Sequence, residues 1–342
     1  MNPAISLANH LQGFFQTYLR EQKGLSPHTI LSYRDTFKVL VAYLQSKCRR
    51  SKLLSVSDLD IKTLLAFLQH LEDPQQGRGN SVQTRNQRLA AIQGFFQYLS
   101  LHSSAFEHQA GRVTAIPRKK AAKRAMESLN HQELEVLLAQ PSPHTPDGIR
   151  DLTLLTFLYN TGARASEVAQ ARRSWFDWSN RTVNILGKGR KQRLIPLWLS
   201  TIQLLKLYAD QYRRKPKPGG QDFFFIDQRG LPFSRFGIRA VVKRHLKAAA
   251  RKCSSLAAKR LSTHSLRHTT AVHLLEAKVE LNVIRVWLGH ESLRSTGHYL
   301  TVNLEQKRRI LEHFGPPSYV VSVLTPKPND SPDQITAWLN TL

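Results

Sequence analysis

Two histidines and an arginine lie a short distance before a tyrosine in the last third of the chain. His264 and Arg267 are three residues apart, His290 follows Arg267 after 23 residues, and Tyr299 follows His290 after nine. A phosphodiester under attack gains negative charge, so it needs fixed donors around its equatorial oxygens and a nucleophile in line. Arginine holds two oxygens with one planar fork. Tyrosine, with a free pKa near ~10, can be the nucleophile when cationic neighbours favour its ionised form.

Two earlier motifs extend this set. Arg164 lies in Thr161-Gly162-Ala163-Arg164-Ala165-Ser166-Glu167, and Lys188, 24 residues later, lies in Gly187-Lys188-Gly189-Arg190-Lys191. The order Arg, Lys, His-x-x-Arg, His, Tyr resembles that of the tyrosine recombinases (phage integrase family). The spacings are similar to those of Xer-type bacterial members, and transposon- or plasmid-encoded members are also possible relatives. Each piece alone occurs by chance, whereas five pieces in order across 136 residues are specific.

The resemblance implies a site-specific recombinase and a role for each residue. Tyr299 would attack a DNA phosphate, form a 3′-phosphotyrosyl link and release a 5′-hydroxyl, and strand exchange would pass through a Holliday junction. Lys188 would protonate the leaving oxygen, with Lys191 as the alternative, and Glu167 would orient the Arg164 region. The phosphoryl oxygens would be held by Arg164, His264, Arg267 and His290. The covalent link keeps the bond energy, so no metal, ATP or other cofactor is expected.

The resemblance also implies partners and leaves alternatives. The expected partners are double-stranded DNA with specific recombination sites, and three further copies of the chain or a related recombinase in a tetrameric synapse, with accessory proteins left open. A type IB topoisomerase would share the chemistry but relax supercoils without a defined site. Integration, excision, resolution and transposition all remain open as the biological role.

The composition of the chain agrees with a nucleic-acid partner. Among 342 residues, 50 Lys and Arg stand against 24 Asp and Glu, which gives a formal charge of +26. Such an excess favours a polyanionic partner, and the length suggests two domains. Cys48 and Cys253 are too few for a disulfide framework or a zinc ribbon and predict reduced thiols in the cytoplasm. The first residues lack a signal-peptide pattern, and no apolar run reaches ~18 residues, so no membrane segment is expected.

The periodicity predicts a mostly α-helical protein whose first domain spans residues 1–103. Helices are expected over residues 6–22, from Ser26-Pro27 onward, from a cap at Ser57 to His70, and from Asn80 or Ser81 to Leu101. Four helices in this length resemble the SAM-like core-binding domain of the recombinases. A polar helix face explains any one of the candidate DNA contacts, which are Thr84, Arg85, Arg88 and Gln93.

Residues 104–128 predict a basic linker between the domains. They show little periodicity and carry the cations Arg112, Arg118, Lys119, Lys120, Lys123 and Arg124. Such a run can follow a DNA backbone, and Lys119 and Lys120 are the candidate contacts. A solvated linker is the alternative, and both descriptions can hold before DNA binds.

Residues 129–315 predict a mixed α+β catalytic domain with a small β-sheet, which the family fold would clamp around DNA as a C shape. Gly162 has the place of a helix-ending glycine just before Arg164, and residues 181–197 predict a β-hairpin with Lys188 near its tip. Candidate DNA contacts are Arg190 and Lys191 on the hairpin and Arg235, Arg239, Lys243 and Arg244 on a helix over residues 233–250.

Two further features have competing interpretations. His264 and His268 lie one helical turn apart, as zinc ligands do, but Arg267 beside them and the lack of further ligands argue against a metal. Residues 316–342 predict a C-terminal tail that docks on a neighbouring subunit, folds back on its own domain or stays disordered.

Overall fold

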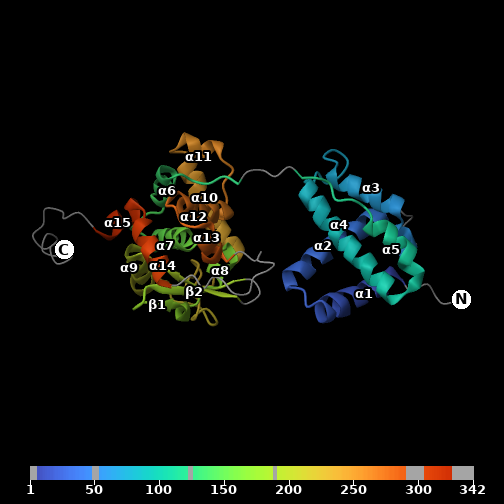
Figure 1. Cartoon of the computed structure of the whole chain (residues 1–342), viewed down its shortest axis with the longest axis horizontal. Coiled ribbons are helices and arrows are strands. Elements are labelled where there is room, and N and C mark those ends of the chain that lie inside the picture. Colours follow the sequence, from blue (N-terminus) through green and yellow to red (C-terminus); the bar gives the residue numbers. More distant parts are fainter. Residues whose placement is uncertain (1–5, 48–53, 122–125, 188–190, 290–303, 326–342) are drawn as a thin grey trace, which may run out of the picture. The chain divides into compact units, whose positions relative to one another are not determined.

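The computed structural model describes residues 6–47, 54–121, 126–187, 191–289 and 304–325. The chain divides into two compact units, Met1–Arg124 and Ala125–Leu342, each with its own hydrophobic core (Figure 1). Within the described residues, no helix is long and apolar enough to cross a membrane.

The first unit is a helical bundle. In chain order it contains α1 (Leu7–Gly13), the π-helix η1 (Phe14–Gln22), α2 (Pro27–Lys47), the 3-10 helix η2 (Val56–Leu59), α3 (Ile61–Glu72), α4 (Val82–His102), the 3-10 helix η3 (Ser104–Phe106) and α5 (Glu107–Thr114). Three aromatic rings meet at its centre, with centroids 5.2–6.0 Å apart, from Phe14, Phe37 and Phe95. The helix predicted over residues 6–22 is present as α1 and η1, and aromatic packing holds it against α2 and α4.

Two helix starts in this unit depend on side-chain caps. Ser81 caps α4 by accepting a hydrogen bond from the backbone N–H of Thr84, as one of the two predicted starts requires. The prediction for α3 is wrong, because Asp60 and not Ser57 is its cap, accepting from the N–H of Thr63 at 2.7 Å. The residues before Asp60 form the separate turn η2.

The predicted linker is wrong over residues 104–116, because this stretch belongs to the bundle. Helix α5 buries Ala110 and Val113, and Ile116 is buried just after it. The Gln93 side chain of α4 donates hydrogen bonds to the backbone oxygens of residues 113, 114 and 116. Ala110 and Val113 of this fifth helix and Ile116 just after it are therefore buried at three-residue spacing, a pattern that the positive charges of this region obscured.

The second unit is also mostly helical. It contains α6 (His131–Leu138), α7 (Pro146–Thr161), α8 (Ala165–Ala169), the 3-10 helix η4 (Arg173–Trp175), β1 (Phe176–Asp177), β2 (Thr182–Leu186), β3 (Gln192–Pro196), α9 (Leu199–Leu207), the π-helix η6 (Tyr208–Tyr212), α10 (Arg235–Ala250), α11 (Ser254–Ala258), α12 (Thr263–Glu276), α13 (Leu281–Leu288), α14 (Leu304–His313) and α15 (Ser318–Leu324). Every residue of α7 from Gly148 to Thr161 is buried, so α7 is the central helix of this core (Figure 1).

A three-stranded antiparallel sheet in the order β1-β2-β3 lies in the second unit. The predicted hairpin is confirmed: β2 pairs with β3 with Ile185 opposite Arg193, and the N–H of Gly187 donates to the oxygen of Lys191 at 2.8 Å. The two-residue strand β1 was not predicted, because so short a strand has no periodicity to detect.

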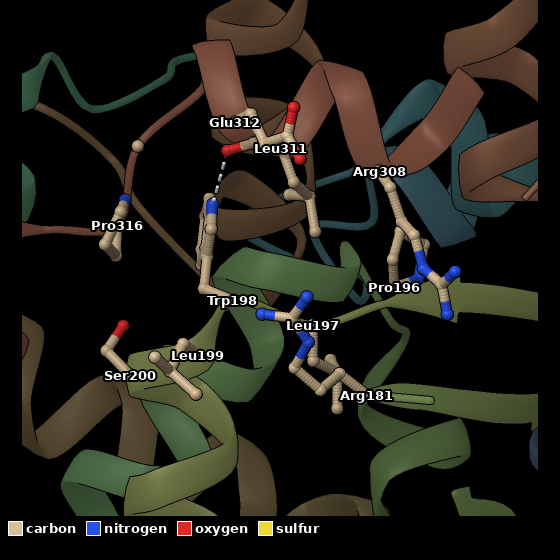
Figure 2. A pocket seen from close by; sticks show the side chains of 11 residues that line it. Arg181, Pro196, Leu197, Trp198, Leu199, Ser200, Arg308, Leu311, Glu312 and Pro316 are labelled. Atoms are coloured by element: carbon tan, nitrogen blue, oxygen red, sulfur yellow. Dashed lines mark hydrogen bonds between the residues drawn. The ribbon is translucent and has the colours of Figure 1, made fainter. Parts of the chain in front are cut away.

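The helix α14 is fixed to the sheet and to α9 by buried polar contacts. Figure 2 shows Trp198, whose indole N–H donates to the backbone oxygens of Leu311 and Phe314, at 3.2 and 2.6 Å. The buried ammonium group of Lys307 donates to the oxygen of Leu194 on β3 at 2.7 Å. These contacts of residues 307, 311 and 314 therefore fix the chain shortly after residue 303.

For the first part of the tail predicted from residue 316, the structure shows one of the three alternatives, folding back on its own domain. The N–H groups of Ser318 and Tyr319 donate to the carboxylate of Glu135 on α6, at 2.6 and 2.9 Å, and Val320 is fully buried. Residues 316–325 therefore fold back on their own unit. The remainder of the tail, residues 326–342, lies outside the described residues.

Candidate active site

Arg164 is positioned by the end of α7 and by Glu167. Gly162 ends α7 with φ +60°, and α8 then starts with Arg164 at its N-cap. The buried carboxylate of Glu167 accepts from the backbone N–H of Arg164 and from its Nη1, both at 2.8 Å. The Arg164 side chain is 33% exposed, so it is held by Glu167 and is still partly accessible to solvent.

Arg193 on β3 is a second partner of Glu167 that the sequence analysis missed. Its Nη2 and Nη1 donate to the two carboxylate oxygens at 2.6 and 3.2 Å. Burial alone would raise the pKa of Glu167, but hydrogen bonds and charge from Arg193 and Arg164 lower it below the ordinary value. Glu167 is therefore ionised at neutral pH and bridges α8 to the sheet.

Arg267 on α12 is a third arginine in this region, close enough to Arg164 and Arg193 for their charges to act on it. It is 4% exposed, and its Nη1 donates to the oxygen of Gly162 at 2.7 Å while its Nη2 donates to the oxygen of Leu288. These bonds join the C-terminal ends of α7 and α13 and use two of the five N–H donors of the guanidinium. Burial, together with the charges of Arg164 and Arg193, lowers the pKa of Arg267, and the charge of Glu167 opposes this effect in part.

His264 lies in the first turn of α12 and borders a cleft of about 490 Å³. Burial and the charges of Arg267 and Arg164 lower its pKa, so the imidazole is neutral at pH 7 and can donate one hydrogen bond without adding charge. The cations that line the same cleft are Arg164, Arg235, Arg239 and Lys243. The last three lie at every fourth residue of α10, on one helix face.

The charge balance of this region favours an anion. Among the described residues, Glu167 is the single carboxylate that pairs with Arg164 and Arg193, and Arg267 donates to carbonyl oxygens instead. Lys307 adds a fourth buried or half-buried cation near Arg193, and burial followed by the charge of Arg193 lowers its pKa to about 8. Several positive charges with one negative partner are chemically suited to bind a phosphoryl group.

Four predicted site residues, Lys188, Arg190, His290 and Tyr299, lie outside the described residues. The two segments that carry them nevertheless start at the cluster. A Cβ on Gly187 would lie 3.5 Å from the Oε1 atom of Glu167, and the oxygen of Gly289 accepts from the Nη2 of Arg164 at 3.5 Å. Lys188 and His290 therefore directly follow residues that contact the Glu167–Arg164 pair.

The comparisons with known proteins agree with this geometry. Residues 127–306 match the Phage integrase family, and residues 12–102 match the family described as Phage integrase, N-terminal SAM-like domain. The chain belongs to the phage integrase family of tyrosine recombinases. It is a DNA strand-breaking and rejoining enzyme of the site-specific recombinase class.

Relatives and solved structures resemble this recombinase over most of its length. It is 36% identical to y4rC of Sinorhizobium fredii, described as an integrase/recombinase, over 344 residues and 100% of both chains. It is 32% identical to tyrosine recombinase XerD of Halalkalibacterium halodurans over 309 residues, 90% of this chain and 98% of the relative. The Tn1549 transposon integrase in complex with circular intermediate DNA shares the fold, with a TM-score of 0.62 and 17% identity over 86% of this chain and 97% of that chain. XerH bound to a palindromic difH substrate shares it with a TM-score of 0.58 and 24% identity over 83% and 76%.

The DNA contacts predicted in the first unit of the recombinase need revision. Arg85 is 5% exposed and donates to the oxygen of Pro117 and to the Asn86 side chain, so it is a structural residue. The Gln93 side chain is likewise bonded to the end of α5 and to the residues that follow it. Thr84 and Arg88 are half-buried. Lys119 pairs with Glu72 at 2.7 Å and Lys120 is exposed, so these four stay predictions.

The DNA contacts predicted in the second unit differ in whether the side chain already has a partner in the structure. Arg235, Arg239 and Lys243 line the cleft, whereas Arg244 pairs with the buried carboxylate of Asp151, which also accepts from His245. Lys191 is exposed at the end of the hairpin. Arg244 therefore has a structural partner that the sequence did not indicate, although 59% of its side chain is exposed.

Within the part of the chain that the structure describes, one group of possible metal ligands occurs away from His264, at His131, His273 and Glu276. Both ring nitrogens of the buried His273 are already bonded, Nδ1 to the Tyr159 hydroxyl and Nε2 to the oxygen of Leu129, each at 2.8 Å. A metal would have to displace one of these bonds, so the group fits a structural polar cluster better than a metal site.

Proposed function

We propose that Tyr299 is the nucleophile with which this recombinase cleaves and rejoins duplex DNA at defined sites. The observation that supports the proposal is the cluster of the cations Arg164 and Arg267 with the neutral His264 beside a basic cleft, where Glu167 is the carboxylate partner of Arg164. The segment containing Tyr299 lies between Gly289, which contacts Arg164, and the anchored helix α14.

The proposed reaction exchanges one ester for another at phosphorus. The Tyr299 oxygen gives its proton to a water molecule and attacks the phosphate, the bond to the 5′-oxygen breaks, and Lys188 supplies the proton that this oxygen takes up. Arg164 and Arg267 compensate the charge of the transition state, and His264 and His290 donate to non-bridging oxygens. The 5′-hydroxyl of a partner strand then attacks the phosphotyrosine and restores Tyr299. In this second step the proton of the 5′-hydroxyl returns to Lys188 and the Tyr299 oxygen takes up a proton from water, so the protons balance and no redox change occurs.

The partner DNA and the assembly are part of the proposal. The face of α10 that carries Arg235, Arg239 and Lys243 would lie along the duplex next to the scissile phosphate, and each phosphate neutralised releases counterions. Exchange between two duplexes requires cleavage of four strands, and each chain supplies one tyrosine. A tetramer of this chain, or of this chain and a related recombinase, is therefore the proposed active assembly, in the cytoplasm.

The test is capture of the covalent intermediate on sheared, nicked DNA from the host genome. A nick near the site releases a short strand that diffuses away, so the cleaved state accumulates as a protein–DNA adduct on a denaturing gel. We expect the wild type and the control variant Tyr319→Phe to form the adduct, and Tyr299→Phe to bind DNA without forming it. An adduct from Tyr299→Phe would reject the nucleophile assignment.

Two additions to the same assay separate the rival reaction classes. Adduct formation in EDTA is expected to match that in buffer, whereas strict dependence on Mg²⁺ would indicate a nuclease. Sequencing of the trapped DNA is expected to yield one shared site. Trapping at unrelated sequences, with relaxation of plasmids that lack the site, would favour a type IB topoisomerase.

A further inference from the structure

Strand β3 buries a charged side chain and exposes the apolar side chain next to it. Arg193 is 8% exposed and lies on the inner face of the sheet, whereas its neighbour Leu194 is 40% exposed. The register places Arg193 opposite Ile185, on the face that also buries Ile195. A charged side chain rarely occupies a buried strand position unless a specific partner compensates it.

The partner of Arg193 is the same carboxylate that holds Arg164. Glu167 accepts four hydrogen bonds, two from Arg164 and two from the fork of Arg193. The Nε of Arg193 is buried and has no hydrogen-bond partner among the described residues. Because both Nη atoms of Arg193 donate to Glu167, Arg193 is not a direct phosphate ligand in this arrangement.

Arg193 also contacts the start of both functional segments. A Cβ on Gly289 would lie 3.3 Å from the Cδ of Arg193, and a Cβ on Gly187 would lie 3.4 Å from its Nη1. Gly289 directly precedes His290, and Gly187 directly precedes Lys188. One buried guanidinium therefore borders Glu167, the hairpin tip and the chain that leads to the tyrosine.

We infer that Arg193 is a positioning residue for DNA cleavage, which acts through Glu167 to set the place of Arg164 beside the scissile phosphate. The inference rests on the proposed function. Without Arg193 the buried carboxylate would have Arg164 as its remaining arginine partner, and Arg164 would be drawn inward to neutralise it. A fork is required, because a single ammonium group cannot hold both carboxylate oxygens in a fixed plane.

The experiment measures the single-turnover rate of adduct formation by the full-length chain on a nicked duplex that carries the recovered site. The variants are Arg193→Gln, Arg193→Lys, Glu167→Gln and the double variant, with Arg181→Gln as the control, an exposed arginine before β2 of the same hairpin. Rates are taken per folded molecule, with DNA affinity and tryptophan fluorescence measured in parallel.

We expect Arg193→Gln to lower the rate about 100-fold, as misplacement of a catalytic group by about 1 Å does, with DNA affinity within threefold of the wild type. Arg193→Lys is expected to lower the rate about tenfold. This variant tests the inference if Arg193→Gln does not fold. The double variant should lose no more than Glu167→Gln alone, because both act through one carboxylate. As the pH is lowered, the cleavage rate of Arg193→Gln should also begin to fall at a higher pH than that of the wild type. The reason is that burial raises the pKa of Glu167 once Arg193 is gone, so Glu167 becomes protonated earlier.

Rates for both Arg193 variants within threefold of the wild type would overturn the inference, and so would losses that add fully in the double variant. A wild-type chain that forms no adduct would instead overturn the proposed function. The two failures are therefore distinguishable.

Discussion

Gly162 is the position at which one methyl group should disturb both the fold and the active site. Its φ is +60°, and a Cβ there would lie 2.3 Å from the Cδ2 atom of Leu288, at the end of α13. The oxygens of these same two residues accept from Arg267. An alanine costs about 1–2 kcal/mol for the left-handed backbone and about 1–3 kcal/mol for overpacking. We therefore expect Gly162→Ala to lower the free energy of unfolding by roughly 2–5 kcal/mol.

The control for this prediction is Gly219→Ala in the same unit. Gly219 has φ +83° with nothing within 4 Å of a Cβ, so only the backbone cost of about 1–2 kcal/mol applies. All five tryptophans lie in Ala125–Leu342, so urea unfolding followed by tryptophan fluorescence reports this unit alone. Adduct formation should also slow in Gly162→Ala because the acceptors of Arg267 move. Equal stability losses in the two variants would refute the packing argument.

Two further predictions concern buried groups. Burial lowers the pKa of Lys307 from 10.5 to about 8, so between these values the unfolded chain binds more protons and stability should rise with pH. Lys307→Met should remove this rise, measured as the difference from wild type in urea midpoints at pH 7 to 10, and an unchanged slope would contradict it. Val113→Ala should destabilise the first unit by about 1–3 kcal/mol, seen as faster amide exchange in α4 with no change in the tryptophan transition. Exchange as slow as in an Arg112→Ala control would mean that α5 contributes nothing to the bundle.

The part of the site that the sequence predicted consists of residues with a local signal. Arg164 follows a helix-ending glycine, and His264 and Arg267 share one turn of a helix, so motif and helix geometry together place them. In the structure Arg164 and His264 line one cleft, Glu167 pairs with Arg164, and Arg267 is close enough for its charge to act on both Arg164 and His264. The hairpin was predictable for the same reason, since its strands alternate around a glycine-rich turn.

The residues that were missed depend on contacts between distant segments. Arg193 was not singled out in the hairpin, although an arginine at the inward position of an alternating strand is a signal for a buried partner. The commitment of Arg85 to Pro117 and of Arg244 to Asp151 joins residues 32 and 93 positions apart, which no local pattern reveals. Helix α5 was missed because positive charges dominate this stretch, and its apolar signal consists only of Ala110, Val113 and the following Ile116.

The central claim is that one phenolic oxygen of this chain becomes esterified to the 3′ end of a cleaved DNA strand. Mass spectrometry of the trapped adduct, after digestion of protein and DNA, identifies the linked residue and the DNA end in one measurement. The account predicts a peptide that carries a 3′-linked nucleotide on Tyr299. A nucleotide on any other side chain, or a link to a 5′ end, would contradict it.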